Sequence, residues 1–460
     1  MSEYAWSDLI KWCEKIEETA KEEGLNFYPQ EFEVCNYEDM LCYETYTGMP
    51  SHYPHWSYGK AYERLKTFYQ YNLSGLPYEM VINSNPCLAY LMKDNTLLLQ
   101  ILTMAHVYGH NDFFRNNHLF VKGTRAELTI EMFKNHADRV RMYIADPSIG
   151  YEKVEKILDA AHALRYQTNR LVGNVRLSYQ EIYKRKEKLQ TILHSDHPLL
   201  EEKQAQKQVN EEDIKKIPPE PEEDLLWFIG EYSNLESWEK DLINIVRNET
   251  GYFLPQIETK IMNEGWASFW HYRLLSLIEL PQDMQWEFFK RHNQVVRPHI
   301  GGLNPYHIGF VIFKYLYEKH GKEKIFEARE IEKDSSFIRR YLNKELCEEL
   351  NLFEYTKNKD EFVVKEISDE EGWEPIRDHL AKIVGLGSIP VVRIINYNPI
   401  ERHILLEHEY DGRELEMNYA SETLRYFARL WKGKVTLRTM INNEERLIQC
   451  DDKLTLSIIK

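Results

Sequence analysis

The chain has 460 residues, a length that predicts at least two domains and a core large enough to fold without disulfides. Its formal net charge of −16 excludes a general nucleic-acid-binding surface, because no net positive field is available to attract phosphates. The six cysteines form no CxxC pair, which excludes a disulfide framework and a thiolate zinc site.

The sequence also lacks the features of a membrane protein. The N-terminus has the pattern of an acidic amphipathic helix, without the apolar core of a signal peptide. The longest apolar stretch, residues 97–107, is interrupted by Gln100 and His106 and is too short to cross a bilayer. We therefore expect a cytoplasmic protein without a transmembrane segment.

Hydrophobic spacing predicts an α+β fold with a large, mainly helical N-terminal domain and a small α+β C-terminal domain. The first half of the helical domain covers residues 1–194 and the second half covers residues 224–350. Between them, residues 195–223 are rich in charge, Gln and Pro, which predicts a solvated linker or surface insertion. A Pro- and Tyr-rich loop is expected over 49–66. Residues 351–460 alternate like strands, with helices expected at 373–384 and 421–431.

Two histidines lie four positions apart in the most apolar predicted helix, within the segment MAHVYGHNDFF. On a helix, His106 and His110 are about 40° apart and project from one face, as two imidazoles must in order to share a metal ion. Zincin metallopeptidases begin their site with HExxH, in which the glutamate activates a zinc-bound water. Val107 stands at that position here, so the metal half of the motif is present without its general base. The alternative is a pair of histidines hydrogen-bonded within a helical core.

A glutamate lies in a second aromatic helix, within the segment MNEGWASFWHY. Glu264 and the histidine seven residues later, His271, share a helix face. The NEGWA string resembles the glutamate helix of gluzincin metallopeptidases, which supplies the third zinc ligand. A zinc-binding core of His106, His110 and Glu264, with His271 as a further candidate, is therefore expected to be zincin-like. Other divalent cations remain alternatives, and the same set could be the facial triad of a non-haem iron site.

The alternative for Glu264 is a structural role, in an ion pair with a neighbour such as Arg273. Three other carboxylates are candidates for the missing general base: Glu79, Asp112 and Glu249. Several residues near these motifs could line a pocket, although core packing explains the aromatic ones equally well: His55, Trp56, Tyr108, Trp266 and His307.

Several long strings of this sequence resemble the stage V sporulation protein R (SpoVR) family over nearly the whole chain. They are YPHWSYGK (53–60), AHVYGHNDFF (105–114), DLLWFI (224–229), MNEGWASFWH (262–271), GGLNPY (301–306), EHEYDGR (407–413) and YASETLRYFARLW (419–431). The resemblance implies a role in forming the spore cortex, in the mother-cell cytoplasm, together with other proteins of cortex assembly. Relatives also occur in bacteria that make no spores, which implies a broader biochemical role. No catalytic activity is attached to the family, so the resemblance supplies no catalytic residues.

Two functions fit these features, and each has its own supporting observation. The first is a metal-dependent hydrolase of a peptide or amide bond, favoured by the His-His-Glu set. The second is a non-catalytic regulator or scaffold of cortex assembly that keeps a structural metal site, favoured by the missing HExxH glutamate. A third possibility, an iron-dependent oxygenase, requires ferrous iron at the same residues.

Overall fold

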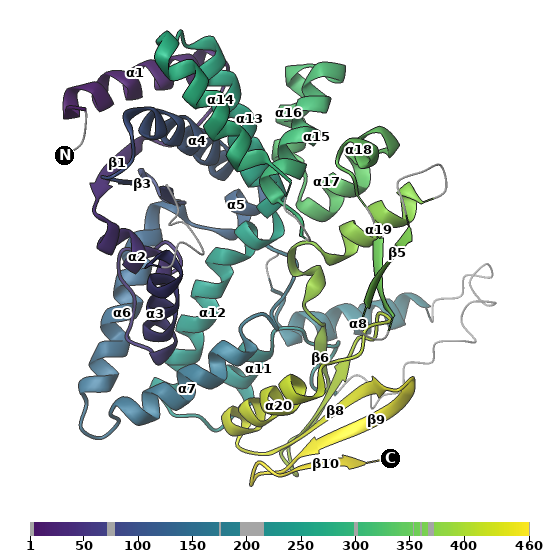
Figure 1. The fold of residues 1–460 in the computed structure, drawn as a ribbon. Helices are drawn as coiled ribbons and strands as arrows, with labels where there is room; N and C mark the ends of the chain where they lie inside the picture. Colours follow the sequence, from purple (N-terminus) through teal and green to yellow (C-terminus); the bar gives the residue numbers. More distant parts are fainter. Residues whose placement is uncertain are drawn as a thin grey trace. The chain divides into compact units, whose positions relative to one another are not determined.

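The fold has a large helical part and a smaller sheet near the C-terminus, as Figure 1 shows, so the predicted α+β class is confirmed. The computed structural model describes residues 4–70, 79–173, 176–193, 216–298, 302–352, 354–358, 361–366 and 372–459. The chain divides into two compact units. The first comprises Met1–Met142 and Gly251–Ser388, and the second comprises Tyr143–Thr250 and Ile389–Lys460.

Helix α13 (Lys260–Leu277) packs against both α4 (Leu97–Asn116) and α15 (Pro305–His320) in the core of the first unit. Every residue of α4 from Gln100 to Phe114 is buried, so any polar side chain on this stretch needs a partner inside the protein. The other helices that lie largely in this unit are α1 (Trp6–Glu22), α2 (Tyr37–Thr45), α3 (Trp56–Gln70), α5 (His118–Gly123), α6 (Thr129–Ala145), α14 (Gln282–Val296), α16 (Lys322–Ile331), α17 (Asp334–Tyr341), α18 (Lys344–Glu349) and α19 (Trp373–Ile383), with 3-10 turns at Ala126–Leu128 and Gly385–Ser388.

Glycines allow α4, α13 and α15 to pack so closely that their backbones are in contact. A Cβ added to Gly309 on α15 would lie 2.1 Å from the Ile261 carbonyl oxygen and 2.6 Å from the Cα of Gly265, both on α13. A Cβ on Gly109 of α4 would lie 2.7 Å from the Cα of Ala267. The position of α13 relative to its two neighbours therefore depends on residues without a side chain.

A three-stranded sheet with the order β1-β3-β2 belongs to the same unit. β1 (Gln30–Cys35) pairs parallel with β3 (Cys87–Met92), and β2 (Glu79–Ile82) pairs antiparallel with β3 at the edge. β2 and β3 both contact α4. The first residue of β2 is Glu79, so the carboxylate of an edge-strand residue lies near α4. A separate hairpin is formed by β4 (Glu354–Asn358) and β5 (Glu361–Glu366).

The second unit contains a five-stranded sheet with the order β10-β9-β8-β7-β6. α20 (Met417–Trp431) connects the parallel strands β7 and β8 and contacts both β8 and α7. The elements of this unit are α7 (Tyr151–Leu164), α8 (Tyr179–Leu193), α11 (Leu225–Tyr232), most of α12 (Ser237–Glu258), β6 (Val392–Asn398), β7 (His403–His408), α20, β8 (Lys434–Ile441), β9 (Glu444–Cys450) and β10 (Leu456–Ile459).

The loop expected over 49–66 ends earlier, because α3 begins at Trp56. The prolines of that stretch, Pro50 and Pro54, both precede the helix, where they do not interrupt helical hydrogen bonds. Most of the charged stretch 195–223 lies outside the described residues, which resume at position 216. None of the helices in the described ranges combines the length and apolar character that a membrane span requires.

Candidate metal centre

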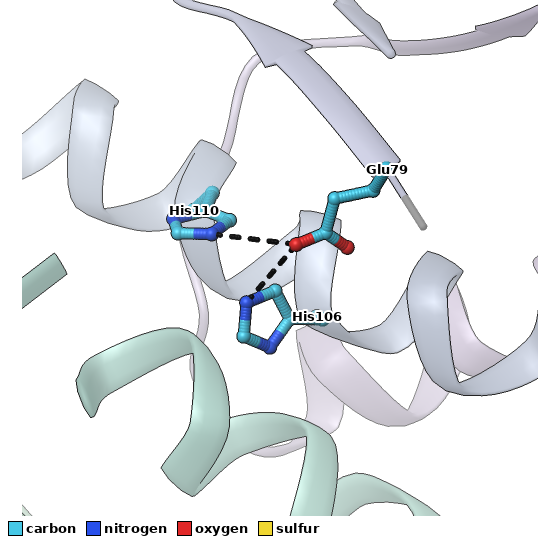
Figure 2. Close-up of side chains that lie close together, drawn as sticks. All are labelled: Glu79, His106 and His110. Carbon is cyan, nitrogen blue, oxygen red and sulfur yellow. Dashed lines mark ion pairs between the residues drawn. The ribbon is translucent and has the colours of Figure 1, made fainter. Parts of the chain in front are cut away.

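Two imidazoles and two carboxylates from three separate elements converge inside the first unit. Glu79 Oε1, at the start of β2, lies 3.2 Å from His106 Nε2 and 3.9 Å from His110 Nε2, and Figure 2 shows its carboxylate facing both rings. On α13, Glu264 Oε2 lies 3.5 Å from His110 Nε2 and 4.0 Å from His106 Nε2. The HxxxH spacing therefore does place both imidazoles on one face of α4, where two carboxylates meet them.

The spacing and chemistry of these atoms fit a metal ion. Glu79, His106 and His110 offer ligand atoms that all lie within 4.8 Å of one another, and this group could hold a metal ion. Tetrahedral zinc, with bonds of about 2.0–2.1 Å, separates its ligand atoms by about 3.4 Å. In the described part of the chain, the Oε2 atoms of Glu79 and Glu264 are buried and receive no hydrogen bond. A cation at this place would satisfy oxygen atoms that the protein leaves without donors.

The outer nitrogen of each imidazole is engaged by α13. His110 Nδ1 lies 2.8 Å from Asn263 Oδ1, and His106 Nδ1 lies 2.8 Å from His271 Nδ1. In both rings Nε2 is therefore the nitrogen that faces the carboxylates. Metal-binding histidines commonly use their second nitrogen in this way, to hold the ring orientation and the tautomer.

Burial dominates the electrostatics of the centre. It raises the pKa of Glu79 well above its usual range, and the nearby carboxylate of Glu264 raises it further. Burial also lowers the pKa of His106 well below its usual range, with further contributions from His110 and His271. The metal-free site thus favours neutral Glu79 and neutral His106, whereas a bound cation would favour the carboxylate and keep the imidazole neutral.

A tyrosine that the sequence did not single out as a site residue completes the group. Tyr306, on the first turn of α15, is hydrogen-bonded to the Glu264 side chain, and its ring lies 6.1 Å from that of His106. Burial raises the pKa of Tyr306 well above its usual range, and Glu264 and Glu79 add to this. The phenol therefore stays protonated. Tyr306 ends the GGLNPY string of the family resemblance, but no metal-ligand spacing marked it as a site residue.

Two further residues, His271 as the remaining candidate ligand and Arg273 as the candidate ion-pair partner of Glu264, do not occupy the positions that the sequence predicted. Both nitrogens of His271 contact other imidazoles, since Nδ1 faces His106 and Nε2 lies 2.8 Å from His292 Nδ1. His271 therefore lies behind His106 and cannot bind the same ion directly, although it shares the helix with Glu264. Arg273 forms its ion pair with Glu23 at 2.7 Å, so it does not neutralise Glu264 as the alternative required.

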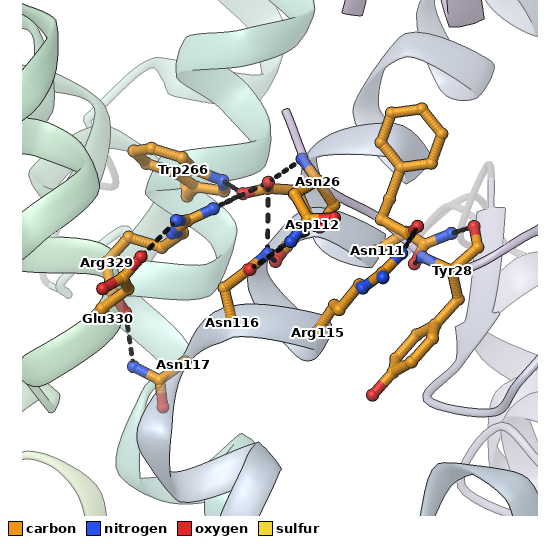
Figure 3. A network of polar contacts seen from close by, with 11 residues as sticks. Asn26, Tyr28, Asn111, Asp112, Arg115, Asn116, Asn117, Trp266, Arg329 and Glu330 are labelled. Atoms are coloured by element: carbon orange, nitrogen blue, oxygen red, sulfur yellow. Dashed lines mark hydrogen bonds and ion pairs between the residues drawn. The ribbon is translucent and has the colours of Figure 1, made fainter. Parts of the chain in front are cut away.

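Of the three candidate bases, Glu79 is the one whose contacts with the imidazoles are described above. Asp112 is fully buried, and Arg329 Nη1 donates to both of its oxygens at 2.7 and 2.8 Å. Trp266 Nε1 and the Asn26 backbone N–H also donate to Asp112, as Figure 3 shows. Glu249 belongs to the second unit. Asp112 and Trp266 thus form a buried structural network, which leaves no oxygen of Asp112 available as a base.

The other candidate pocket residues do not share one location. Tyr108, on a different face of α4 from the two histidines, donates its hydroxyl to Glu17 on α1 at 3.0 Å. His55 Nδ1 lies 2.7 Å from the Ser57 hydroxyl at the start of α3, where Trp56 is 50% exposed. His307 is half-buried on α15, and burial lowers its pKa. A helix turns by about 100° per residue, which explains why Tyr108 points away from its neighbours in the motif.

Comparison with known families accounts for almost the whole chain. The family model described as SpoVR like protein matches residues 3–389, and that of the SpoVR-like C-terminal domain matches residues 390–442. The chain belongs to the SpoVR family. This membership indicates a sporulation-related protein. The two models meet next to Ile389, where the chain enters the sheet-bearing part of the second unit.

One curated relative matches the chain over nearly the full length of both proteins. The chain is 33% identical over 484 aligned positions to the uncharacterized protein YcgB of Escherichia coli strain K12, with 96% of this chain and 93% of that protein covered. No solved structure matches the chain.

Acidification is expected to destabilise the metal-free protein between about pH 6.5 and pH 4. Burial lowers the pKa of His292 from 6.5 to about 4. Below pH 6.5 the unfolded chain binds a proton that folded His292 does not, so the free energy of unfolding falls until His292 itself is protonated near pH 4. Its full contribution is about 3 kcal/mol.

Urea unfolding of chelator-treated protein at pH 7.5 and pH 4.5 measures this loss. The His292→Gln variant should lose less stability between the two pH values than the wild type. Equal losses in the two proteins would show that His292 does not contribute.

Proposed function

We propose that this SpoVR-family protein is a divalent-metal hydrolase that cleaves a peptide or amide bond during formation of the spore cortex. The observation that carries the proposal is the convergence of two imidazoles and two carboxylates from β2, α4 and α13, at 3.2–4.0 Å, inside the first unit. The role in the cortex rests on family membership. The protein would act in the mother-cell cytoplasm with other proteins of cortex assembly.

The residues divide into metal-holding and proton-handling groups. His106, His110 and Glu264 would hold the metal, with zinc as the ion that best fits two imidazoles and a carboxylate. When bound, zinc polarises a substrate carbonyl and lowers the pKa of a water molecule. Glu79 would act as the proton acceptor, because its carboxylate faces both imidazoles. A strand residue would thus replace the helix glutamate whose position is taken by Val107.

A structural metal site is the second candidate, and one distance favours it. Glu79 Oε1 is nearer to His106 Nε2 than Glu264 Oε2 is, at 3.2 Å against 4.0 Å. If Glu79 binds the ion as well, four protein ligands surround it. Structural zinc sites are closed in this way, whereas catalytic sites keep one position open. The protein would then be a regulator or scaffold stabilised by its metal.

Elemental analysis of the wild type and four variants tests both candidates. We expect about one equivalent of zinc in the wild type and in Glu79→Gln, and loss of zinc in His106→Ala and Glu264→Gln. Hydrolysis of peptidoglycan-derived peptides should require zinc and should fall at least a hundredfold in Glu79→Gln, which lacks the base. Glu33→Gln, an exposed change on strand β1 of the same sheet, serves as the control and should match the wild type.

Each other result has a defined meaning. Loss of zinc in Glu79→Gln, without hydrolysis by the wild type, supports the closed structural site. Absence of metal in the wild type after incubation with zinc contradicts both candidates and leaves the histidines as packing residues.

A further inference from the structure

Three imidazoles form a continuous hydrogen-bonded chain that leads away from the candidate metal centre. His106 on α4 contacts His271 on α13 through their Nδ1 atoms at 2.8 Å, and His271 Nε2 contacts His292 Nδ1 on α14 at 2.8 Å. His106 and His271 are fully buried and His292 is 4% exposed. The hydrolase mechanism uses only the first of the three rings.

Each contact in this chain needs one N–H and one lone pair, so the tautomers of the three rings are linked. If His106 carries its proton on Nδ1, His271 must accept it at its own Nδ1 and carry its proton on Nε2. His292 must then accept at Nδ1. The reverse order would place a proton on His106 Nε2, the nitrogen that faces Glu79 and Glu264.

A metal ion at Nε2 would select between the two directions. Coordination uses the lone pair of Nε2, so the proton of the neutral His106 ring would then be on its outer nitrogen, Nδ1. The carbonyl of Ala267, which can only accept, is a further hydrogen-bond partner of the ring. The chain then runs outward from His106, with every N–H pointing away from the metal centre.

The last ring of the chain is held in place by packing. The rings of Tyr272 and Phe310 lie 4.7 and 4.9 Å from that of His292, measured between ring centroids. This aromatic enclosure restricts rotation of the imidazole and keeps Nδ1 directed at His271. The acceptor at the end of the chain is therefore fixed before any ligand binds.

We propose that His271 and His292 are positioning residues that lock His106 in the tautomer whose Nε2 lone pair is available to a metal ion. This inference rests on the proposed metal site and adds two residues that do not touch the ion. Asn263 performs the same task for His110 with an amide oxygen. Thus His110 is oriented by the amide oxygen of Asn263, whereas His106 is oriented by the two imidazoles of His271 and His292.

Zinc affinity, measured by competition with a chromophoric chelator, tests the chain. His271→Leu removes the acceptor and is expected to weaken zinc binding about 10- to 100-fold, as loss of an outer-shell partner commonly does. His271→Gln should restore most of the affinity, because its amide oxygen can accept from His106 and its amide nitrogen can donate to His292. His292→Phe should weaken binding, and His292→Gln should weaken it less. His136→Leu, a change of a histidine on α6 that is 4% exposed, as His292 is, controls for loss of a buried imidazole.

Nitrogen NMR of the wild type with labelled histidine gives a second readout that needs no variant to fold. The zinc-loaded protein should show the proton of His106 on Nδ1 and that of His271 on Nε2. A proton on Nδ1 of His271 would overturn the proposal, and so would wild-type zinc affinity in His271→Leu. These results are distinct from failure of the metal site itself, in which the wild type binds no zinc or His106→Ala binds it normally.

Discussion

Replacement of Asp112 by Asn is expected to lower the free energy of unfolding by about 3–5 kcal/mol. Asp112 and Arg329 are both buried, at 0% and 4% exposure, and their ion pair has contacts of 2.7 and 2.8 Å. The variant would remove the buried counter-charge of the guanidinium and leave it only Glu330, an exposed carboxylate at 2.9 Å. The amide nitrogen would also face groups that donate hydrogen bonds, the Trp266 Nε1–H or the Asn26 N–H. Urea unfolding followed by circular dichroism measures the loss.

Two further variants separate the buried pair from a general effect of removing charge. Asp138→Asn breaks an exposed i,i+3 pair with Arg141 and should change stability by less than about 0.5 kcal/mol. In the double variant Asp112→Asn with Arg329→Gln, part of the lost stability should return, because the guanidinium that lost its buried partner is gone. If Asp112→Asn is as mild as Asp138→Asn, the network of Figure 3 does not stabilise the unit.

Substitution of Gly309 by Ala is expected to destabilise the first unit by about 3 kcal/mol, at the upper end of overpacking effects. The new methyl group would lie 2.1 Å from the Ile261 carbonyl oxygen and 2.6 Å from the Cα of Gly265. Backbone atoms cannot move aside as a flexible side chain can, so α13 and α15 must separate. Glu264 is next to Gly265 in the chain, and Tyr306 of α15 is hydrogen-bonded to the Glu264 side chain. Zinc affinity should therefore fall together with the midpoint of urea unfolding.

The same substitution on an open helix face provides the control. A Cβ on Gly59 of α3 meets no atom within 4 Å, so Gly59→Ala should raise stability by up to about 1 kcal/mol through helix propensity. The two Gly→Ala variants are thus predicted to have opposite signs. Stabilisation by Gly309→Ala would contradict the close packing of α13 on α15.

The start of α13 is fixed independently of these glycines. The two oxygens of Asp334, the first residue of α17, accept the backbone N–H groups of Ile261 and Met262 at 2.8 and 2.9 Å. These donors belong to the first turn of the helix, where they have no partner within the helix itself. Glu264 follows two residues later. The Glu264 carboxylate is therefore positioned by the fixed start of α13 and by the packing of α13 against α15.

The local parts of the centre could be predicted from sequence because helix geometry is local. The spacing of four positions from His106 to His110 suffices to place both rings on one face, and the structure shows both Nε2 atoms facing the same carboxylates. The same periodicity predicted that both motifs lie on helices, which are α4 and α13 in the structure. The change to strand-like alternation after residue 350 also depends only on neighbouring positions.

The identity of the partners was decided by tertiary structure. Glu79 was only one of three candidate bases, and its approach to the imidazoles depends on β2 taking the edge of a sheet that packs on α4. His271 shares the helix of Glu264 but lies behind His106, because each side chain's direction is set by how α13 rests on α4. Contacts between residues far apart in sequence follow from helix packing at Gly109, Gly265 and Gly309, and no local pattern encodes which side chains meet there. The sequence thus determined the two histidines and their common face, and only the packing of α4, α13 and β2 decided what surrounds them.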